Sequence, residues 1–173
     1  KNIYLGVDFL PLMKLLKPKN INFFETTDRI LNHFLQRIGK NGNLVIPVFN
    51  FDCIPDKKFH ITKSPGQSGV LGNILLSKYS SLRTHHPLYS FLCFGNKFEK
   101  YKKIKNTNGT EKNSLWKHFI DDEFDLVTLG HHYSRSITHV HYIEDLLDVD
   151  YRFDLKFLVK YTNRKNVTSK KTF

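Results

Sequence analysis

Short apolar runs alternate along this chain with longer stretches in which apolar residues recur every three or four positions. The short runs end at glycine or at polar residues, and they predict β-strands at residues 3–7, 44–49, 90–94, 126–129 and 153–159. The periodic stretches predict helices at residues 27–38, 69–78, 98–104, 115–120 and 138–147. Because strands and helices alternate, the pattern favours an α/β fold with functional loops at the strand ends.

Polar and turn-forming residues predict where these elements stop. Gly39 closes the helix at 27–38, and Thr26, Thr27 or Asp28 is its expected N-cap. Residues 105–110 indicate a polar connection inside the domain, and residues 162–172 indicate a polar, frayed tail. No internal repeat or low-complexity segment divides the chain, so we expect residues 1–173 to form a single domain.

The composition is typical of a globular enzyme. A chain of 173 residues with 40% hydrophobic content is long enough to bury a core and is not wholly disordered. Two cysteines, Cys53 and Cys93, are too few for a disulfide framework, and their spacing is not that of a zinc site. No apolar run of membrane-spanning length and no signal peptide is visible, so we expect a cytoplasmic location.

A Thr-x-x-His-x-x-Glu spacing opens the last predicted helix. Thr138 is its expected N-cap, and Glu144 shares a helix face with His141 because residues three apart are neighbours on a helix. A carboxylate beside an imidazole fixes the tautomer and strengthens the ring as a base. The same spacing also occurs as an ordinary surface pair, so the pattern alone leaves both interpretations open.

A second polar group precedes the strand at 90–94. His86 stands in the sequence Arg83-Thr84-His85-His86-Pro87, and the proline keeps His86 extended and prevents a helix from continuing. Loops at strand ends often carry sites, which makes His86 a candidate. The alternative is that these residues only solvate a loop.

A glycine-bearing turn leads into the helix at 69–78. Ser68 and Gly69 stand at its start, where free backbone amides suit a phosphate or a pantetheine-type ligand. The spacing matches neither a Walker A loop nor a dinucleotide fingerprint. Ser68 also fails as a nucleophile elbow, because Val70 stands at the last glycine position of the Gly-x-Ser-x-Gly pattern.

Two other classes of function stay open. Histidine pairs could ligate a metal in a hydrolase, and they are His85-His86, His131-His132 and His139-x-His141. The lysine-rich segment at 97–105, with Phe98 and Tyr101 among its lysines, would suit a nucleic-acid binder. No recognised nucleic-acid motif accompanies it, so we expect no nucleic acid as a partner.

Five segments follow one another in an order known from one enzyme family. They are residues 43–52, Pro65-x-x-x-Gly69-x-Leu71, Arg83-Thr84-x-His86-Pro87-x-x-Ser90, Asn113-Ser114-Leu115, and Leu129-Gly130 followed by Thr138-x-x-His141-x-x-Glu144. Together they resemble the aminoglycoside 3-N-acetyltransferase family, the antibiotic N-acetyltransferases, over about residues 41–157. The resemblance implies a layered α/β/α architecture with a central mixed sheet. It also implies an N-acyltransferase that moves an acetyl or other acyl group from acyl-coenzyme A to an amine of an amino sugar or an aminoglycoside antibiotic.

The resemblance implies roles for several residues. His141 is the expected general base, Glu144 orients it, and the acyl group moves directly with no acyl-enzyme. Backbone amides or His86 are expected to stabilise the oxyanion. The coenzyme is expected to contact four residues, Ser68, Gly69, Thr84 and Thr138. No metal ligand is implied, and a homo-oligomer remains open.

The sequence departs from the family pattern in several places. Residues 4–8 lack the His-Ser-Ser that helps family members hold the coenzyme, and Asn73 stands where the family often has a glutamate. The chain begins at the first strand and stops soon after Leu158, so the resemblance implies that family segments are missing at both ends.

The net charge of +11 bears on the acceptor. A basic surface attracts polyanions such as coenzyme A or a nucleotide-linked sugar, and it repels a polycation such as an aminoglycoside. We therefore expect an amino sugar, for example a nucleotide-linked one, rather than an antibiotic as acceptor. The alternative is that the lysine-rich surface only solvates the protein.

Overall fold

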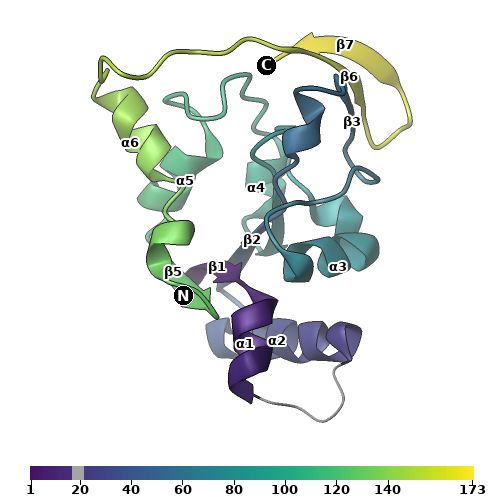
Figure 1. Cartoon of the computed structure of the whole chain (residues 1–173), viewed down its shortest axis with the longest axis vertical. Coiled ribbons are helices and arrows are strands. Elements are labelled where there is room, and N and C mark those ends of the chain that lie inside the picture. Colours follow the sequence, from purple (N-terminus) through teal and green to yellow (C-terminus); the bar gives the residue numbers. More distant parts are fainter. Residues whose placement is uncertain (17–21) are drawn as a thin grey trace.

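A four-stranded mixed sheet forms the centre of the molecule (Figure 1). The structure is a computed structural model that describes residues 1–16 and 22–173. The sheet contains β1 (Asn2–Val7), β2 (Asn43–Pro47), β4 (Phe91–Gly95) and β5 (Phe124–Leu129) in the order β4-β2-β1-β5. β1 runs parallel to β2 and β5, whereas β4 is antiparallel to β2.

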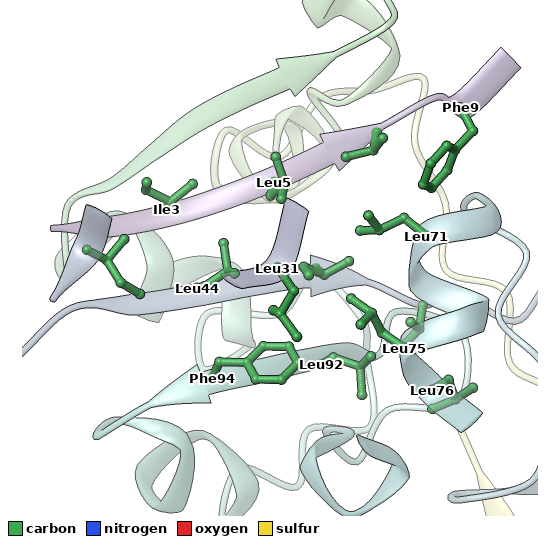
Figure 2. Packing of buried hydrophobic residues seen from close by; sticks show 14 of the residues in the cluster. Ile3, Leu5, Phe9, Leu31, Leu44, Leu71, Leu75, Leu76, Leu92 and Phe94 are labelled. Carbon is green, nitrogen blue, oxygen red and sulfur yellow. The ribbon is translucent and has the colours of Figure 1, made fainter. Parts of the chain in front are cut away.

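Helices cover both faces of this sheet because alternate strand residues point to opposite sides. On one face, Leu5, Leu44 and Leu92 pack with Leu31 and Leu75 (Figure 2). That face is covered by α1 (Phe9–Leu16), α2 (Phe23–Ile38) and α3 (Val70–Tyr79).

An aromatic cluster fills the opposite face of the sheet. Tyr4 and Phe91 pack there against Trp116, Phe119 and Tyr142. The covering helices are α4 (Phe98–Lys102), α5 (Leu115–Asp121) and α6 (Val140–Leu146). The expected α/β/α layering with a central mixed sheet is therefore confirmed.

A small second sheet lies beyond the main one. It consists of β3 (Lys58–His60), β6 (Leu158–Thr162) and β7 (Thr168–Thr172) in the order β3-β6-β7. Its buried residues form a separate cluster, Cys53, Phe59, Ile61, Val159, Tyr161 and Phe173.

The buried Arg83 joins the two sheets. Its guanidinium lies 4.7 Å from the centre of the Phe59 ring, in the small-sheet cluster. It also donates to the Val48 carbonyl oxygen at 2.8 Å and to Ser90 Oγ at 2.9 Å, next to the ends of β2 and β4. A further N–H donates to the Ser64 carbonyl oxygen. Arg83 therefore connects the main sheet with the small sheet.

Most of the predicted elements are confirmed, with two corrections near the carboxyl end. The strand expected at 153–159 is wrong in its first part, since strand pairing starts only at Leu158 and the Phe153 side chain is 85% exposed. This segment crosses from α6 to the small sheet without pairing (Figure 1). The frayed tail expected at 162–172 is also wrong. These residues close a β6–β7 hairpin in which Leu158 pairs with Thr172.

Two expected helix caps are corrected. α2 begins at Phe23, and Asn22 caps it by accepting from the N–H groups of Phe24 and Glu25, both at 3.1 Å. The N-cap of α6 is His139, one residue after Thr138. Gly39 does end α2, with a φ of 71°. In the described part of the chain, no helix is both long enough and apolar enough to cross a membrane.

Candidate functional site

A cleft of about 410 Å³ opens where β1 and β5 end and α3 begins; we call it the strand-end cleft. Its walls come from β1 and the start of α1, from the turn before α3, and from the loop after β5. They are lined by Tyr4, Gly6, Val7, Asp8, Phe9, Leu10, Pro47, Phe49, Phe51, Ser68, Gly69, Val70, His131, Arg135, Ser136 and Thr138. The carboxyl ends of parallel strands are the usual place for a ligand in such sheets.

The turn before α3 contributes Ser68 and Gly69 to this cleft. Ser68 Oγ accepts from the Phe49 N–H at 3.0 Å, so its own hydroxyl proton is free to donate. Gly69 has a φ of 130°, and an added Cβ would lie 3.0 Å from the Val7 carbonyl oxygen. Only glycine suits this position, where the chain passes close to β1 and then starts α3 without a side-chain cap.

The loop after β5 covers the end of β1. A Cβ on Gly6 would meet Ser136 Oγ at 2.2 Å, so the missing side chain makes room for the loop. Ser136 Oγ is 2.7 Å from His131 Nε2, and His131 Nδ1 is 3.3 Å from the Leu129 carbonyl oxygen. If Nδ1 carries the proton, Nε2 accepts from the Ser136 hydroxyl, which fixes the floor of the cleft.

The predicted His141–Glu144 pair is present on α6. His141 Nδ1 lies 2.9 Å from Glu144 Oε2. The same carboxylate oxygen accepts from Arg152 Nη1 at 2.7 Å, and Tyr151 donates its hydroxyl proton to Oε1 at 3.1 Å. The bonds from His141 and Arg152 lower the pKa of Glu144 to about 2, so this carboxylate is ionised at neutral pH.

Thr138 connects the pair to the strand-end cleft. Its side chain lines that cleft, one helical turn before His141. It also lies beside the Tyr4 hydroxyl, whose pKa is raised by burial. Its carbonyl oxygen accepts from the His141 N–H at 3.1 Å, which ties His141 to the cleft wall.

Two further hollows include Arg152, the partner of Glu144. The larger, which we call the aromatic cleft, has a volume of about 470 Å³ and includes His86, Tyr89, Arg152, Phe153 and Phe173. The smaller has a volume of about 160 Å³ and is lined by Glu144, Asp145, Asp148, Val149, Arg152, Phe153 and Asp154. Arg152 belongs to both, so it stands between the His–Glu pair and the aromatic cleft.

His86 and Thr84 are held by the backbone. His86 Nε2 donates to the Thr107 carbonyl oxygen at 3.2 Å, and Nδ1 accepts from the Tyr89 N–H at 3.0 Å. Burial lowers the pKa of His86 to about 4, so the ring is neutral near pH 7. Thr84 Oγ1 accepts from the Phe91 N–H at 2.9 Å and is fully buried. Neither residue lines the strand-end cleft, and both nitrogens of His86 already have partners.

The histidines are not gathered into one cluster. Over residues 1–16 and 22–173, no group of three or more His, Cys, Asp or Glu side chains is placed to hold a metal ion. His85 Nδ1 lies 3.0 Å from the Tyr161 hydroxyl, whereas His131 contacts Ser136 and His141 contacts Glu144.

Sequence reasoning did not find Arg152, Tyr151 or the His131–Ser136 pair. Arg152 follows α6 in an irregular segment, and its contact with Glu144 depends on the chain turning back after the helix. No fixed sequence spacing predicts such a contact. For Ser136, the signal was the glycine at position 6, because a bare strand position often marks a close approach.

Comparison with known proteins shows a family match and related folds. Residues 19–172 match the family model described as aminoglycoside 3-N-acetyltransferase. The structure resembles the YokD protein from Bacillus subtilis with a TM-score of 0.76 at 14% identity, covering 99% of this chain and 72% of that one. It resembles AAC-IIIb in a binary complex with CoASH with a TM-score of 0.78 at 16% identity, covering 99% and 67%. It resembles aminoglycoside acetyltransferase AAC(3)-IIb with a TM-score of 0.76 at 13% identity, covering 99% of this chain and 67% of that one. A search of curated protein sequences gave no significant match.

Proposed function

The chain belongs to the aminoglycoside 3-N-acetyltransferase family, and from this premise we propose that it transfers an acetyl group from acetyl-coenzyme A to an amine of an amino sugar. The observation that carries the proposal is the contact of 2.9 Å between Glu144 Oε2 and Nδ1 of His141, three residues after Thr138, which lines the strand-end cleft. When the ionised carboxylate of Glu144 accepts a hydrogen bond from the proton on Nδ1, the Nε2 atom of the neutral ring carries no proton and can accept one.

His141 is the proposed general base. A protonated amine cannot attack a thioester, so a proton must leave the acceptor nitrogen before or during attack. With its Nδ1 proton donated to Glu144, His141 accepts that proton at Nε2. The new bond joins the amine nitrogen to the acyl carbon, the bond between that carbon and the coenzyme sulfur breaks, and the leaving sulfur takes up the proton that His141 accepted.

The strand-end cleft is the proposed place for the pantetheine arm. Ser68 offers a free hydroxyl proton, the first turn of α3 offers backbone N–H groups, and Thr138 lies between the cleft and His141. Backbone N–H groups are also the better candidates for stabilising the oxyanion, because both ring nitrogens of His86 are already bonded.

The acceptor amine is proposed to approach from the smaller of the two hollows that include Arg152. Asp145, Asp148 and Asp154 line this hollow together with Glu144, and their negative charge suits a protonated amine. At short range these carboxylates oppose the repulsion from the net charge of +11. An aminoglycoside is the acceptor that the family indicates, and a nucleotide-linked amino sugar stays a prediction from the overall charge.

Calorimetric titration with acetyl-coenzyme A tests the proposal first, with desulfo-coenzyme A and ATP as controls. We expect saturable binding that requires the pantetheine arm. Binding by ATP alone, or no binding by the folded chain, would contradict a coenzyme site.

Turnover of the variant His141→Ala tests the base. Removal of a general base should reduce turnover by about a hundredfold or more while coenzyme affinity changes little. His33→Ala is the matched control, because His33 is exposed on α2, away from both clefts. Unchanged turnover in the His141 variant would require another base.

A further inference from the structure

Arg152, His141 and Glu144 meet in one compact triangle of atoms. Arg152 Nη1 lies 2.7 Å from Glu144 Oε2 and 2.8 Å from His141 Nδ1. The third side, from His141 Nδ1 to Glu144 Oε2, is 2.9 Å. All three groups therefore compete for one another at hydrogen-bond distance.

The donors and acceptors in this triangle cannot all be satisfied together. An arginine nitrogen only donates and an ionised carboxylate only accepts, whereas Nδ1 of a neutral imidazole either donates or accepts. With a proton, Nδ1 bonds to Glu144 and faces an N–H of Arg152. Without one, it accepts from Arg152 and faces a carboxylate oxygen. Each protonation state makes one good contact and one poor one.

We propose that Arg152 is a positioning residue that competes with His141 for Glu144 and thereby sets which ring nitrogen of His141 carries the proton. When Arg152 holds Oε2, the bond from the Nδ1 proton to Glu144 is weakened, and the tautomer with the proton on Nε2 gains population. In that tautomer Nε2 already carries a proton, so it cannot accept one from the acceptor amine. When Arg152 moves away, Nδ1 donates to Glu144 and Nε2 is ready to accept a proton.

The position of Arg152 connects this competition to the acceptor. Its side chain is 29% exposed, lines the aromatic cleft, and contacts the pair through Nη1. A sugar oxygen bound in that cleft would be an alternative acceptor for the guanidinium. The functional meaning of this step rests on the proposed acyl transfer, in which His141 is the base.

The tautomer is measured directly by nitrogen NMR of histidine-labelled protein, with His141→Asn to assign the signals. We expect the variant Arg152→Met, without coenzyme or acceptor, to hold a larger fraction of His141 with the proton on Nδ1. Arg152→Lys should restore part of the original ratio, because lysine again donates to Glu144. An unchanged ratio in Arg152→Met would overturn the proposal.

A second variant separates competition for Glu144 from a general structural effect. In Glu144→Gln the contested oxygen is no longer anionic, so adding Arg152→Met should cause little further change in the tautomer ratio. An equally large change with and without Glu144 would overturn the proposal. Arg29→Met is the control, because Arg29 is exposed on α2. These measurements need no turnover, so they stand apart from the test of the proposed function.

Kinetics give an independent readout if the chain transfers acetyl groups. Arg152→Met should raise the KM for the amino sugar several-fold, because the sugar oxygen loses its guanidinium partner. The value of kcat should be retained, because more of His141 then carries its proton on Nδ1 and can accept one at Nε2. A fall in kcat with KM unchanged would show that Arg152 supports the pair instead of competing with it, and would overturn the proposal.

Discussion

His86, a residue expected to stabilise the oxyanion, is firmly held by its surroundings in the fold. Its imidazole is 2% exposed and bonded at both nitrogens, to the Thr107 carbonyl oxygen and the Tyr89 N–H. These two bonds hold the loop at 107 against the segment that leads into β4. The ring also stacks on Tyr89, with ring centres 5.9 Å apart. We therefore infer that His86 acts by keeping the loop in place.

This buried ring makes stability depend on pH. Burial lowers the pKa of His86 from 6.5 in the unfolded chain to about 4 in the folded one. Between these values the unfolded chain binds more protons, so the free energy of unfolding should fall as pH drops from 6.5 to 4, by about 3 kcal/mol for this group. Above pH 6.5 the contribution is fully present. Denaturant unfolding at several pH values measures the slope.

Variants identify the source of that slope. His86→Gln should be less stable at neutral pH but should show a shallower fall between pH 6.5 and 4. His85 adds a similar contribution, because burial also lowers its pKa to about 4. His33→Gln, at an exposed position of α2, should keep the full slope. An equally steep slope in His86→Gln would show that other groups cause the acid sensitivity.

At the scale of elements, α3 is held close to β2 by a glycine. A Cβ on Gly72 would lie 2.6 Å from the Pro47 carbonyl oxygen, which is backbone and cannot turn aside. α3 closes one wall of the strand-end cleft, so its distance from the sheet also sets the width of that cleft.

The variant Gly72→Ala should therefore be destabilised by about 1–3 kcal/mol, because overpacking forces the helix away from the strand. This loss opposes the usual gain of about 1 kcal/mol when alanine replaces glycine in a helix. Urea unfolding measures the net effect. Ser77→Ala, at an exposed position of the same helix, should stay close to the original stability. Stabilisation of Gly72→Ala would mean that the contact relaxes freely.

The start of α2 supports another prediction. Asn22 accepts from two backbone N–H groups, those of Phe24 and Glu25. Asn22→Ala should cost about 1 kcal/mol, since the helix then begins with unpaired N–H groups. Asn32→Ala, in the exposed middle of α2, should not lower stability. Equal effects of the two substitutions in thermal unfolding would argue against the cap.

Some elements could be predicted from the sequence, and others could not, for reasons that these residues make clear. β2 and β4 are buried on both faces, so their continuous apolar runs were sufficient to predict strands. The β6–β7 hairpin places only Val159 and Tyr161 inward, between exposed lysines and threonines, and its polar residues imitated a frayed end. In the segment around Phe153, alternating apolar residues suggested a strand, but pairing depends on a neighbour that the local pattern does not specify.

The candidate site divides in the same way. The His141–Glu144 contact follows from helical spacing alone and was predictable. The contacts of Arg152 with that pair, and of Ser136 with His131 above Gly6, depend on how loops return to the sheet. Thr138, Ser68 and Gly69 do line one cleft, whereas Thr84 is buried against β4. Their roles toward the coenzyme stay predictions.

At the scale of the whole molecule, Arg83 makes the two sheets depend on each other. Its fully buried guanidinium contacts Val48, Ser64, Ser90 and the Phe59 ring. Loss of the side chain would leave backbone acceptors without a donor, which is costly in a buried place. We therefore propose that residues 1–173 unfold as one domain.

The two cysteines report on this coupling, because Cys53 lies in the small-sheet cluster and Cys93 in β4. Burial raises the pKa of the Cys53 thiol to about 12 and also raises the pKa of Cys93, so neither should react with a thiol reagent in the folded protein. In increasing urea, both should become reactive at the same concentration, as measured by mass spectrometry of labelled peptides. In Arg83→Lys, Cys53 should react before Cys93. Early labelling of Cys53 in the unmodified protein would show two independent units.

The order of the main sheet has a consequence for biosynthesis. β1 lies between β2 and β5, and it pairs with β5 along its whole length, from Asn2 with Phe124 to Val7 with Leu129. Of the strands in the described part of the chain, β1 leaves the ribosome first, yet its second neighbour is among the later strands to be made. Until then the row of β1 backbone groups that faces β5 has no partner, which exposes the nascent chain to aggregation. β1 must therefore be kept from pairing with other chains until β5 follows.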